Sequence, residues 1–141
     1  MELAVEARPI AALTLNGSYT YTNADTDRDI SVGGFFQALG VHPHTATVAA
    51  TQRWGKRFDT TMTMFRGSSH YSSLFAGGRS RAYQFAGFTN LGLMFNYRFW
   101  EGEKHSARLY TRIDNALNQT YYEQSWLAAR ATFVTGIGYT F

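Results

Sequence analysis

The chain has 141 residues, a formal net charge of +3 and no cysteine, which suits one domain and excludes disulfides and cysteine-ligated metals. Charged and aromatic residues each make up 16% of it, and no apolar run reaches the roughly 18 residues of a membrane helix. Its basic residues are scattered, which argues against nucleic-acid binding. The composition fits an outer-membrane β-barrel or a tyrosine-rich soluble β-sandwich.

Alternating apolar and polar residues predict about seven strands and no helix. In chain order we expect strands over 2–8, 13–22, 44–54, 58–71, 84–100, 106–115 and 130–141. Short turns are expected at 9–12, 55–57 and 101–105, and long loops at 23–43, 72–83 and 118–129. Gly67 is expected to mark a bulge in the fourth strand.

Each predicted strand has a bulky apolar face and a smaller, more polar face. In the last strand the bulky face is Phe133, Ile137, Tyr139 and Phe141. Arg66 is the only charged residue expected on a bulky face, and the opposite faces carry Glu2, Glu6, Arg8, Arg53, Asp59, Arg98, Arg108, Arg112 and Asp114. A cationic side chain facing lipid at mid-depth costs about 2–4 kcal/mol, so a barrel would show this partition. A soluble sandwich would show it too.

Loop lengths and aromatic positions favour the membrane alternative. Short and long connections alternate strictly, as they do in up-and-down outer-membrane barrels. Aromatic residues gather beside the short turns (Trp54, Phe58, Phe99, Trp100, Tyr139, Phe141) and beside the long loops (Tyr19, Tyr21, Tyr71, Tyr83, Phe85, Tyr121, Tyr122). Two such groups match the aromatic girdles at the two membrane interfaces. The predicted fold is therefore an all-β, antiparallel up-and-down transmembrane β-barrel segment.

The C-terminal third resembles the end of TonB-dependent outer-membrane receptors. In that family the penultimate strand ends in an Asp/Glu-Asn-Leu motif near a loop with two tyrosines. Here Asp114-Asn115-Ala116-Leu117 and Tyr121-Tyr122-Glu123 precede the final RATFVTGIGYTF. Further upstream, Leu13–Asp25 resembles the family's recurring strand-and-loop start, 41–46 its Pro-x-His strand entry and 93–99 one of its strand ends, so the resemblance covers essentially the whole chain.

The resemblance implies a 22-stranded barrel with a plugged lumen, of which residues 1–141 would be about the last third, without the plug domain or the signal peptide. It implies TonB-energised uptake of a scarce ligand in the bacterial outer membrane, most plausibly a ferric siderophore, with haem or cobalamin as other ligands. The implied partners are TonB, the plug, outer-membrane lipid and lipopolysaccharide. The terminal strand resembles the signal read by the barrel-insertion machinery: Gly136, Tyr139 and Phe141 fit it, whereas Val134 replaces the usual polar residue.

Candidate ligand contacts lie in or beside the long loops: Arg79, Arg81, Tyr83, Trp126 and Arg130. Arginine pairs with anionic ligands and aromatic rings stack on chelators, although ordinary loop surface is the simpler interpretation. The charged residues of the polar faces, Asp59, Arg98, Arg108, Arg112 and Asp114, are expected to pair among themselves.

No metal site, cofactor or enzymatic activity is expected. Asp25-x-Asp27-x-Asp29 lacks the glycine and glutamate of a Ca²⁺ loop, with Ile30 and Phe36 in their places. His42 and His44 lack a third ligand and are expected to be structural, and no catalytic motif is present. Two alternatives stay open: a small self-contained outer-membrane barrel acting as an adhesin or structural protein, and a soluble β-sandwich binding module.

Overall fold

The computed structural model describes residues 1–23 and 38–141, which form eleven strands and no helix. The strands are β1 (Glu2–Ile10), β2 (Leu13–Tyr21), β3 (His44–Trp54), β4 (Phe58–Gly67), β5 (His70–Ala76), β6 (Arg79–Phe85), β7 (Phe88–Glu101), β8 (Ser106–Asp114), β9 (Tyr122–Glu123), β10 (Trp126–Leu127) and β11 (Thr132–Thr140). Across these two ranges we find no helix long and apolar enough to span a bilayer.

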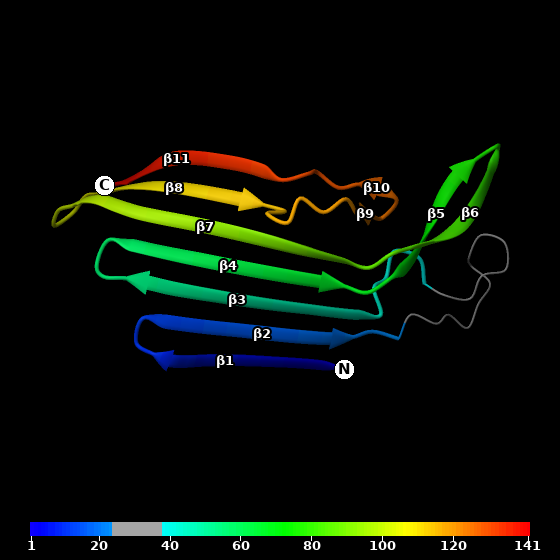
Figure 1. Cartoon of the computed structure of the whole chain (residues 1–141), viewed down its shortest axis with the longest axis horizontal. Helices are drawn as coiled ribbons and strands as arrows, with labels where there is room; N and C mark the ends of the chain where they lie inside the picture. The colour runs from blue at the N-terminus through cyan, green and yellow to red at the C-terminus, as the bar shows by residue number, and fades with distance from the viewer. Residues whose placement is uncertain (24–37) are drawn as a thin grey trace.

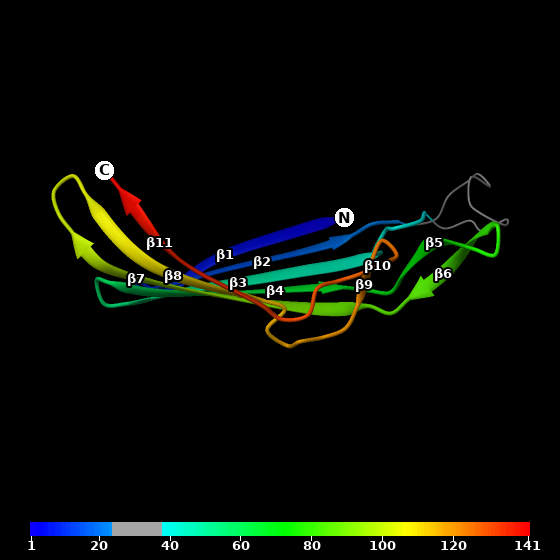
Figure 2. The same cartoon turned by 90° about the horizontal axis from the view of Figure 1, so that it is seen from above.

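Seven strands form one antiparallel sheet in the order β1-β2-β3-β4-β7-β8-β11 (Figure 1). The pairs β5–β6 and β9–β10 are separate two-stranded hairpins beyond the end of that sheet that carries the long connections. Seen from above, the seven strands make a single twisted layer (Figure 2). The all-β antiparallel prediction is confirmed. The sheet is open, with β1 and β11 at its edges, so the described residues do not close a barrel.

Strand register makes the apolar face continuous across the sheet. Met62 lies opposite Ala50 and Leu93, and Ile113 lies opposite Leu93 and Phe133. Because side chains alternate with a period of two, these pairings align every apolar face on the same side. Arg66, the one charged residue expected there, lies at the long-loop end of β4 and donates to the Thr89 hydroxyl over 3.1 Å.

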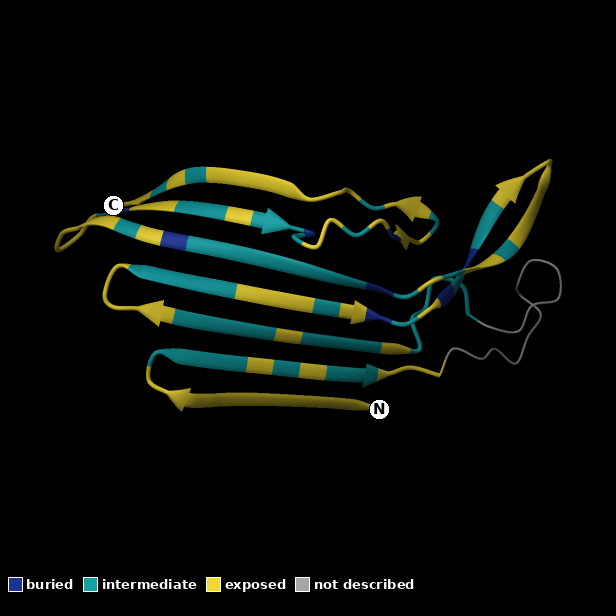
Figure 3. Cartoon of the chain, in the orientation of Figure 1, coloured by how far each residue is buried: buried dark blue, intermediate teal, exposed yellow. Residues whose placement is uncertain are grey.

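The apolar face is not covered by any second layer of the described residues. Ile137 is 72% exposed and Phe133 is 65% exposed, and the only buried apolar residues of the described chain are Phe88, Ala107 and Tyr121. Figure 3 shows the buried positions gathered mainly where the long connections leave the sheet. A soluble β-sandwich needs a second sheet over the apolar face, and the described residues place none there.

Two predicted boundaries at the long-loop end are wrong. The expected strand 58–71 stops at Gly67, which ends β4 instead of forming a bulge, and Ser68 and Ser69 separate it from β5. The expected loop 72–83 is mostly the β5–β6 hairpin. Its turn is Gly77-Gly78, with φ of 60° and 76°, which two-residue hairpin turns favour. Serine and arginine at strand positions hid the alternation.

Smaller differences follow from strand context. β1 continues through Pro9 to Ile10, because an edge strand can spare the missing N–H. The expected strand 84–100 divides into the end of β6 and the start of β7 at Phe88, and the expected loop 118–129 contains the short β9–β10 pair.

β7 contains a bulge near its short-turn end that the sequence did not reveal. Arg98 pairs with Arg108, and the next pair is Trp100 with Ala107, so Phe99 is an extra residue in the ladder. The bulge puts Trp100 near Tyr139 and His105, with ring centroids 6.0 and 6.1 Å from its own. An aromatic group therefore forms at this end of the sheet, as the sequence predicted.

Candidate functional site

A hollow of about 290 Å³ lies on the polar face of the sheet across β4, β7 and β8. Gly92 creates it, because a Cβ there would have as its nearest neighbours only the Thr63 carbonyl oxygen at 3.8 Å, a second carbonyl at 3.9 Å and an Asp114 carboxylate oxygen at 4.0 Å. The lining residues are Thr61, Thr63, Phe65, Asn90, Gly92, Leu93, Met94, Arg112 and Asp114. Hydroxyl groups, one side-chain amide and one ion pair thus surround a partly apolar surface. Such a surface suits the binding of a small molecule with both polar and apolar parts.

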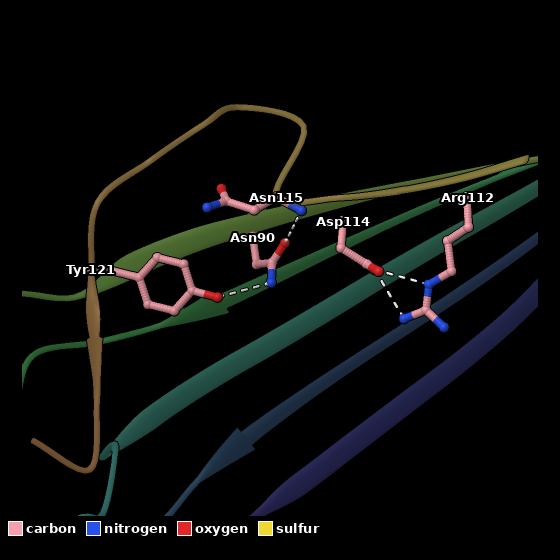
Figure 4. Close-up of polar contacts among 5 residues, drawn as sticks. All are labelled: Asn90, Arg112, Asp114, Asn115 and Tyr121. Atoms are coloured by element: carbon pink, nitrogen blue, oxygen red, sulfur yellow. Dashed lines mark hydrogen bonds and ion pairs between the residues drawn. The ribbon is translucent and has the colours of Figure 1, made fainter. Parts of the chain in front are cut away.

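Arg112 and Asp114 form the charged part of this hollow (Figure 4). They are two residues apart on β8 and so share its polar face, and Arg112 Nη2 and Nε each lie 2.9 Å from Asp114 Oδ1. The pair is partly exposed, so its own contribution to stability is at most about 1 kcal/mol. The remaining guanidinium donors are free to bind an anionic or polar group in the hollow.

Asn90, Tyr121 and Asn115 fix the upper edge of the hollow (Figure 4). Asn90 Nδ2 donates to the Tyr121 hydroxyl over 3.0 Å, and its Oδ1 accepts from the Asn115 backbone N–H over 3.2 Å. The side chain of Asn115 is buried, and its Nδ2 donates to the carbonyls of Gln119 and Ala129, both over 2.9 Å. The φ of Asn115 is 51°, a left-handed conformation that asparagine tolerates better than most residues. The loop after β8 is therefore anchored directly above the hollow.

Burial raises the pKa of Tyr121 above its ordinary value of 10.0, and the nearby carboxylate of Glu123 adds to the rise. The hydrogen bond from Asn90 acts in the opposite direction, and Asp114 raises the pKa further. Tyr121 is thus a neutral phenol at physiological pH, and its ring stacks on Phe88 with centroids 4.0 Å apart.

A histidine pair lies beside Phe88, where β5–β6 leaves the sheet. His70 is 2% exposed, its ring centroid is 4.1 Å from that of His42, and neither of its ring nitrogens has a hydrogen-bond partner among the described residues. Burial, and then the neighbouring His42, lower the pKa of His70 below its ordinary value of 6.5. His42 Nδ1 bonds to the Ser68 carbonyl at 2.5 Å. Within 1–23 and 38–141, no three His, Cys, Asp or Glu side chains are grouped to hold a metal ion.

The structure places four of the five predicted ligand contacts on two joined hairpins. Arg79, Arg81 and Tyr83 alternate along β6 and therefore share one face of the β5–β6 hairpin. At its base, the Ser72 hydroxyl lies 2.6 Å from that of Ser125, and Trp126 follows directly, with 80% of its surface exposed. The fifth, Arg130, lies apart and donates to the Asn118 carbonyl over 3.3 Å. Ligand binding by these residues stays a prediction.

The predicted assembly residues lie on β11 and the chain end. Gly136 is on the polar face beneath Tyr110, whose hydroxyl would be only 2.6 Å from a Cβ at that position. The rings of Tyr139 and Phe141 lie on the apolar side at the short-turn end, with centroids 6.2 Å apart. The acidic stretch Asp25-x-Asp27-x-Asp29 lies outside the described residues.

Sequence reasoning missed Gly92, Asn115 and His70 as organising residues. Gly92 stood in an otherwise regular strand on its polar face, and a strand-interior glycine signals a close approach or a gap. Asn115 at a strand end is a recognisable left-handed position. His70 gave no signal, because its burial depends on residues far apart in the sequence.

No protein-family model and no curated protein sequence matches the chain. Among solved structures, it is similar to one described as "Structure of the FpvAI-pyocin S2 complex", with a TM-score of 0.66 and 9% sequence identity. The match covers 99% of this chain and 18% of the other, and FpvA is a TonB-dependent receptor. At this identity the likeness concerns the fold alone. The chain spans less than a fifth of the length of the chain that it matches.

Proposed function

We propose that this chain is part of the barrel wall of a TonB-dependent receptor in the bacterial outer membrane. In this proposal it serves TonB-energised uptake of a scarce ligand, a ferric siderophore, and catalyses no reaction. The continuous, uncovered apolar face carries the proposal. It crosses all seven strands in register, and its one charged residue, Arg66, lies at a strand end. Such a face is suited to hydrocarbon and ill suited to water.

The strand count supports a place within a larger barrel. In an antiparallel sheet of seven strands, the two edge strands point the same way, and β1 and β11 both run toward the short-turn end (Figure 1). These edges cannot pair with each other in an antiparallel ladder. Closing an antiparallel barrel therefore requires an odd number of further strands. A 22-stranded barrel leaves an odd remainder, whereas a self-contained seven-stranded barrel would need a parallel closure.

The long connections and the two outer hairpins would then face the outside, where a ligand first arrives. Arg79, Arg81 and Tyr83 on β6 and Trp126 on β10 are the proposed first contacts. The hollow at Gly92 lies on the polar face, which would line the lumen below them. In the full protein the plug domain and TonB would be partners, and lipid and lipopolysaccharide would cover the apolar face.

Single-cysteine labelling tests the assignment of the faces, because the chain has no native cysteine. Leu93→Cys and Met94→Cys are neighbours on opposite faces of β7. In the membrane, we expect a lipid-soluble maleimide to label Cys at 93 only and a water-soluble maleimide to label Cys at 94 only. Gly78→Cys at the β5–β6 turn should react on intact cells, and Glu103→Cys only after the outer membrane is opened. Equal labelling at 93 and 94 by the water-soluble reagent would contradict the proposal.

Growth on a defined iron source tests the transported ligand. Cells lacking the full receptor should fail to grow on one ferric siderophore as the sole iron source and grow normally on free iron. Arg81→Ala and Tyr83→Ala should raise the siderophore concentration needed for growth, and Thr14→Ala, on the polar face near the short-turn end of β2, should leave it unchanged. Unchanged growth of the deletion strain on siderophores, with a defect on haem or cobalamin, would replace the siderophore by that ligand.

A further inference from the structure

A second hollow, of about 540 Å³, lies at the short-turn end of the polar face. Its floor is made by small residues of two turns, Ala11 and Gly55 among them. Arg53, Lys56 and Arg98 supply three positive charges around it, and Glu101 supplies one negative charge. Neither the proposed ligand contacts nor the Gly92 hollow involves these residues.

The arginines of this hollow are held in place by backbone carbonyls. Arg53 Nη2 donates to the Ala11 carbonyl over 2.5 Å, and Arg98 Nη2 donates to the Lys56 carbonyl over 2.9 Å. Each guanidinium has five N–H donors, so most donors of Arg53 stay available, and Arg98 uses one more on Glu101 at 3.5 Å. Holding the guanidinium groups in advance lowers the entropy lost when an anion binds.

The positive charge is only partly neutralised within the described chain, by the ion pair of Arg98 with Glu101. Arg53 lies opposite Asp59 in the register, yet it forms no ion pair with that carboxylate, which accepts from Asn96 over 2.9 Å. Arg98 lies opposite Arg108, an arrangement that costs stability unless an anion joins the two.

Arg108 extends this unneutralised charge toward β11. A Cβ on Gly138 would be 3.0 Å from Arg108 Nε, so Arg108 lies across the bare backbone of that glycine. It makes no hydrogen bond or ion pair with any residue of 1–23 or 38–141. Guanidinium groups on β3, β7 and β8 therefore stand at one end of the polar face without a matching set of carboxylates.

We propose that this end of the polar face binds an acidic peptide segment, through the guanidinium groups of Arg53, Arg98 and Arg108. The planar fork of arginine matches a carboxylate in two parallel hydrogen bonds, and groups on three strands suit successive side chains of an extended segment. The site lies on the face opposite the apolar one, so a phospholipid in contact with the apolar face would have to reach round the rim. The proposed function adds only that the short-turn end, opposite the long connections, would face the periplasm, and that placement rests on the proposed function.

The test uses the full 141-residue chain in zwitterionic detergent and a fluorescent decapeptide rich in glutamate, with a lysine-rich decapeptide of equal length as the reference probe. Fluorescence anisotropy should show binding of the acidic peptide only, weakened by added salt. Removing one exposed charge pair costs up to about fivefold in affinity. We therefore expect about tenfold loss for the double variant Arg53→Gln, Arg98→Gln, about threefold loss for Arg108→Gln, and no change for Arg66→Gln at the long-loop end of β4.

Arg108→Gln keeps the proposal testable if the double variant fails to fold, because Arg108 makes no bond that the described fold would lose. Equal affinity of Arg108→Gln and Arg66→Gln would overturn the proposal, and so would equal binding of the two peptides. Anionic phospholipid can also be added to the detergent micelles. If it abolishes peptide binding, the proposal is overturned in favour of a site for lipid headgroups. Cysteine labelling at 93 and 94 tests the membrane assignment separately, so either proposal can fail alone.

Discussion

Val48 and Ala49 offer a matched test of the two faces of the sheet. They are neighbours at mid-depth of β3, an internal strand, and Val48 lies on the apolar face opposite Gly17 and Met64. Ala49 lies on the polar face opposite Asn16 and Thr63. Arginine at either position therefore lies on the same strand at nearly the same depth, and only the face differs.

Val48→Arg should destabilise the folded chain by about 2–4 kcal/mol if the apolar face meets lipid. This is roughly a 30-fold to 700-fold fall in the ratio of folded to unfolded protein. Ala49→Arg should cost less than about 1 kcal/mol, because its charge stays in a hydrated lumen. If the apolar face were in water, Val48, which is 40% exposed, would behave as a surface residue, and its substitution would change stability by only about 0.5 kcal/mol.

Urea unfolding of the full receptor in lipid vesicles, followed by the gel shift between folded and heat-denatured protein, gives both values. The reasoning is refuted if the two substitutions cost the same, or if Ala49→Arg costs more. A third variant, Val48→Ala, separates the lost packing of valine from the cost of the charge, and its effect should be well below that of Val48→Arg.

Four further outcomes are expected. In buffer without detergent the chain should form large aggregates through the unpaired edges β1 and β11, measured by light scattering, and a monodisperse monomer would contradict the exposed apolar face. Gly136→Ala should cost no more than about 1 kcal/mol, because its Cβ would meet the ring end of Tyr110, a side chain that can turn away on the polar face; a loss above about 3 kcal/mol would point to a role other than packing. Asn115→Ala should cost about 1–3 kcal/mol and make residues 115–131 sensitive to protease, whereas Asn118→Ala, at an exposed position, should do so less. His70 has a lowered pKa, so the stability that it gives to the base of β5–β6 is full above about pH 6.5 and is lost as the pH falls through the folded-state pKa. Hydrogen exchange of β5–β6 should become faster over that pH range, and His70→Phe should abolish the pH dependence.

The seven strands of the main sheet and their two faces could be predicted from the sequence, because a period of two is a local property. The β5–β6 hairpin could not, since Ser72, Ser73, Arg79 and Arg81 give no apolar alternation and the hairpin is not part of the sheet. The bulge at Phe99 is a shift in the pairing of β7 with β8, and the sequence of β7 alone does not contain that pairing. Buried contacts such as His42 with His70 join residues 28 positions apart, and no local pattern indicates them.

The candidate site divides in the same way. Residue types that suit anion binding were recognisable in the loops, and the structure gathers Arg79, Arg81, Tyr83 and Trp126 on two joined hairpins. The hollow at Gly92 forms where β4, β7 and β8 lie side by side and one of them lacks a side chain. The positively charged hollow at Arg53 and Arg98 forms where two short turns at the same end of the sheet come together. Both are properties of neighbouring strands and not of any one segment.

The bulge at Phe99 determines where this chain tolerates a change of length. Deleting Phe99 would restore a regular ladder between β7 and β8 and would leave Trp100 on its present face. Deleting one residue elsewhere in β7, such as Gly92, would exchange the faces of every residue between the deletion and the bulge, turning Asn96 and Arg98 toward the apolar side. Single-residue insertions and deletions should therefore survive selection at this one point of the strand, and natural variation in the hairpin from β7 to β8 should concentrate there.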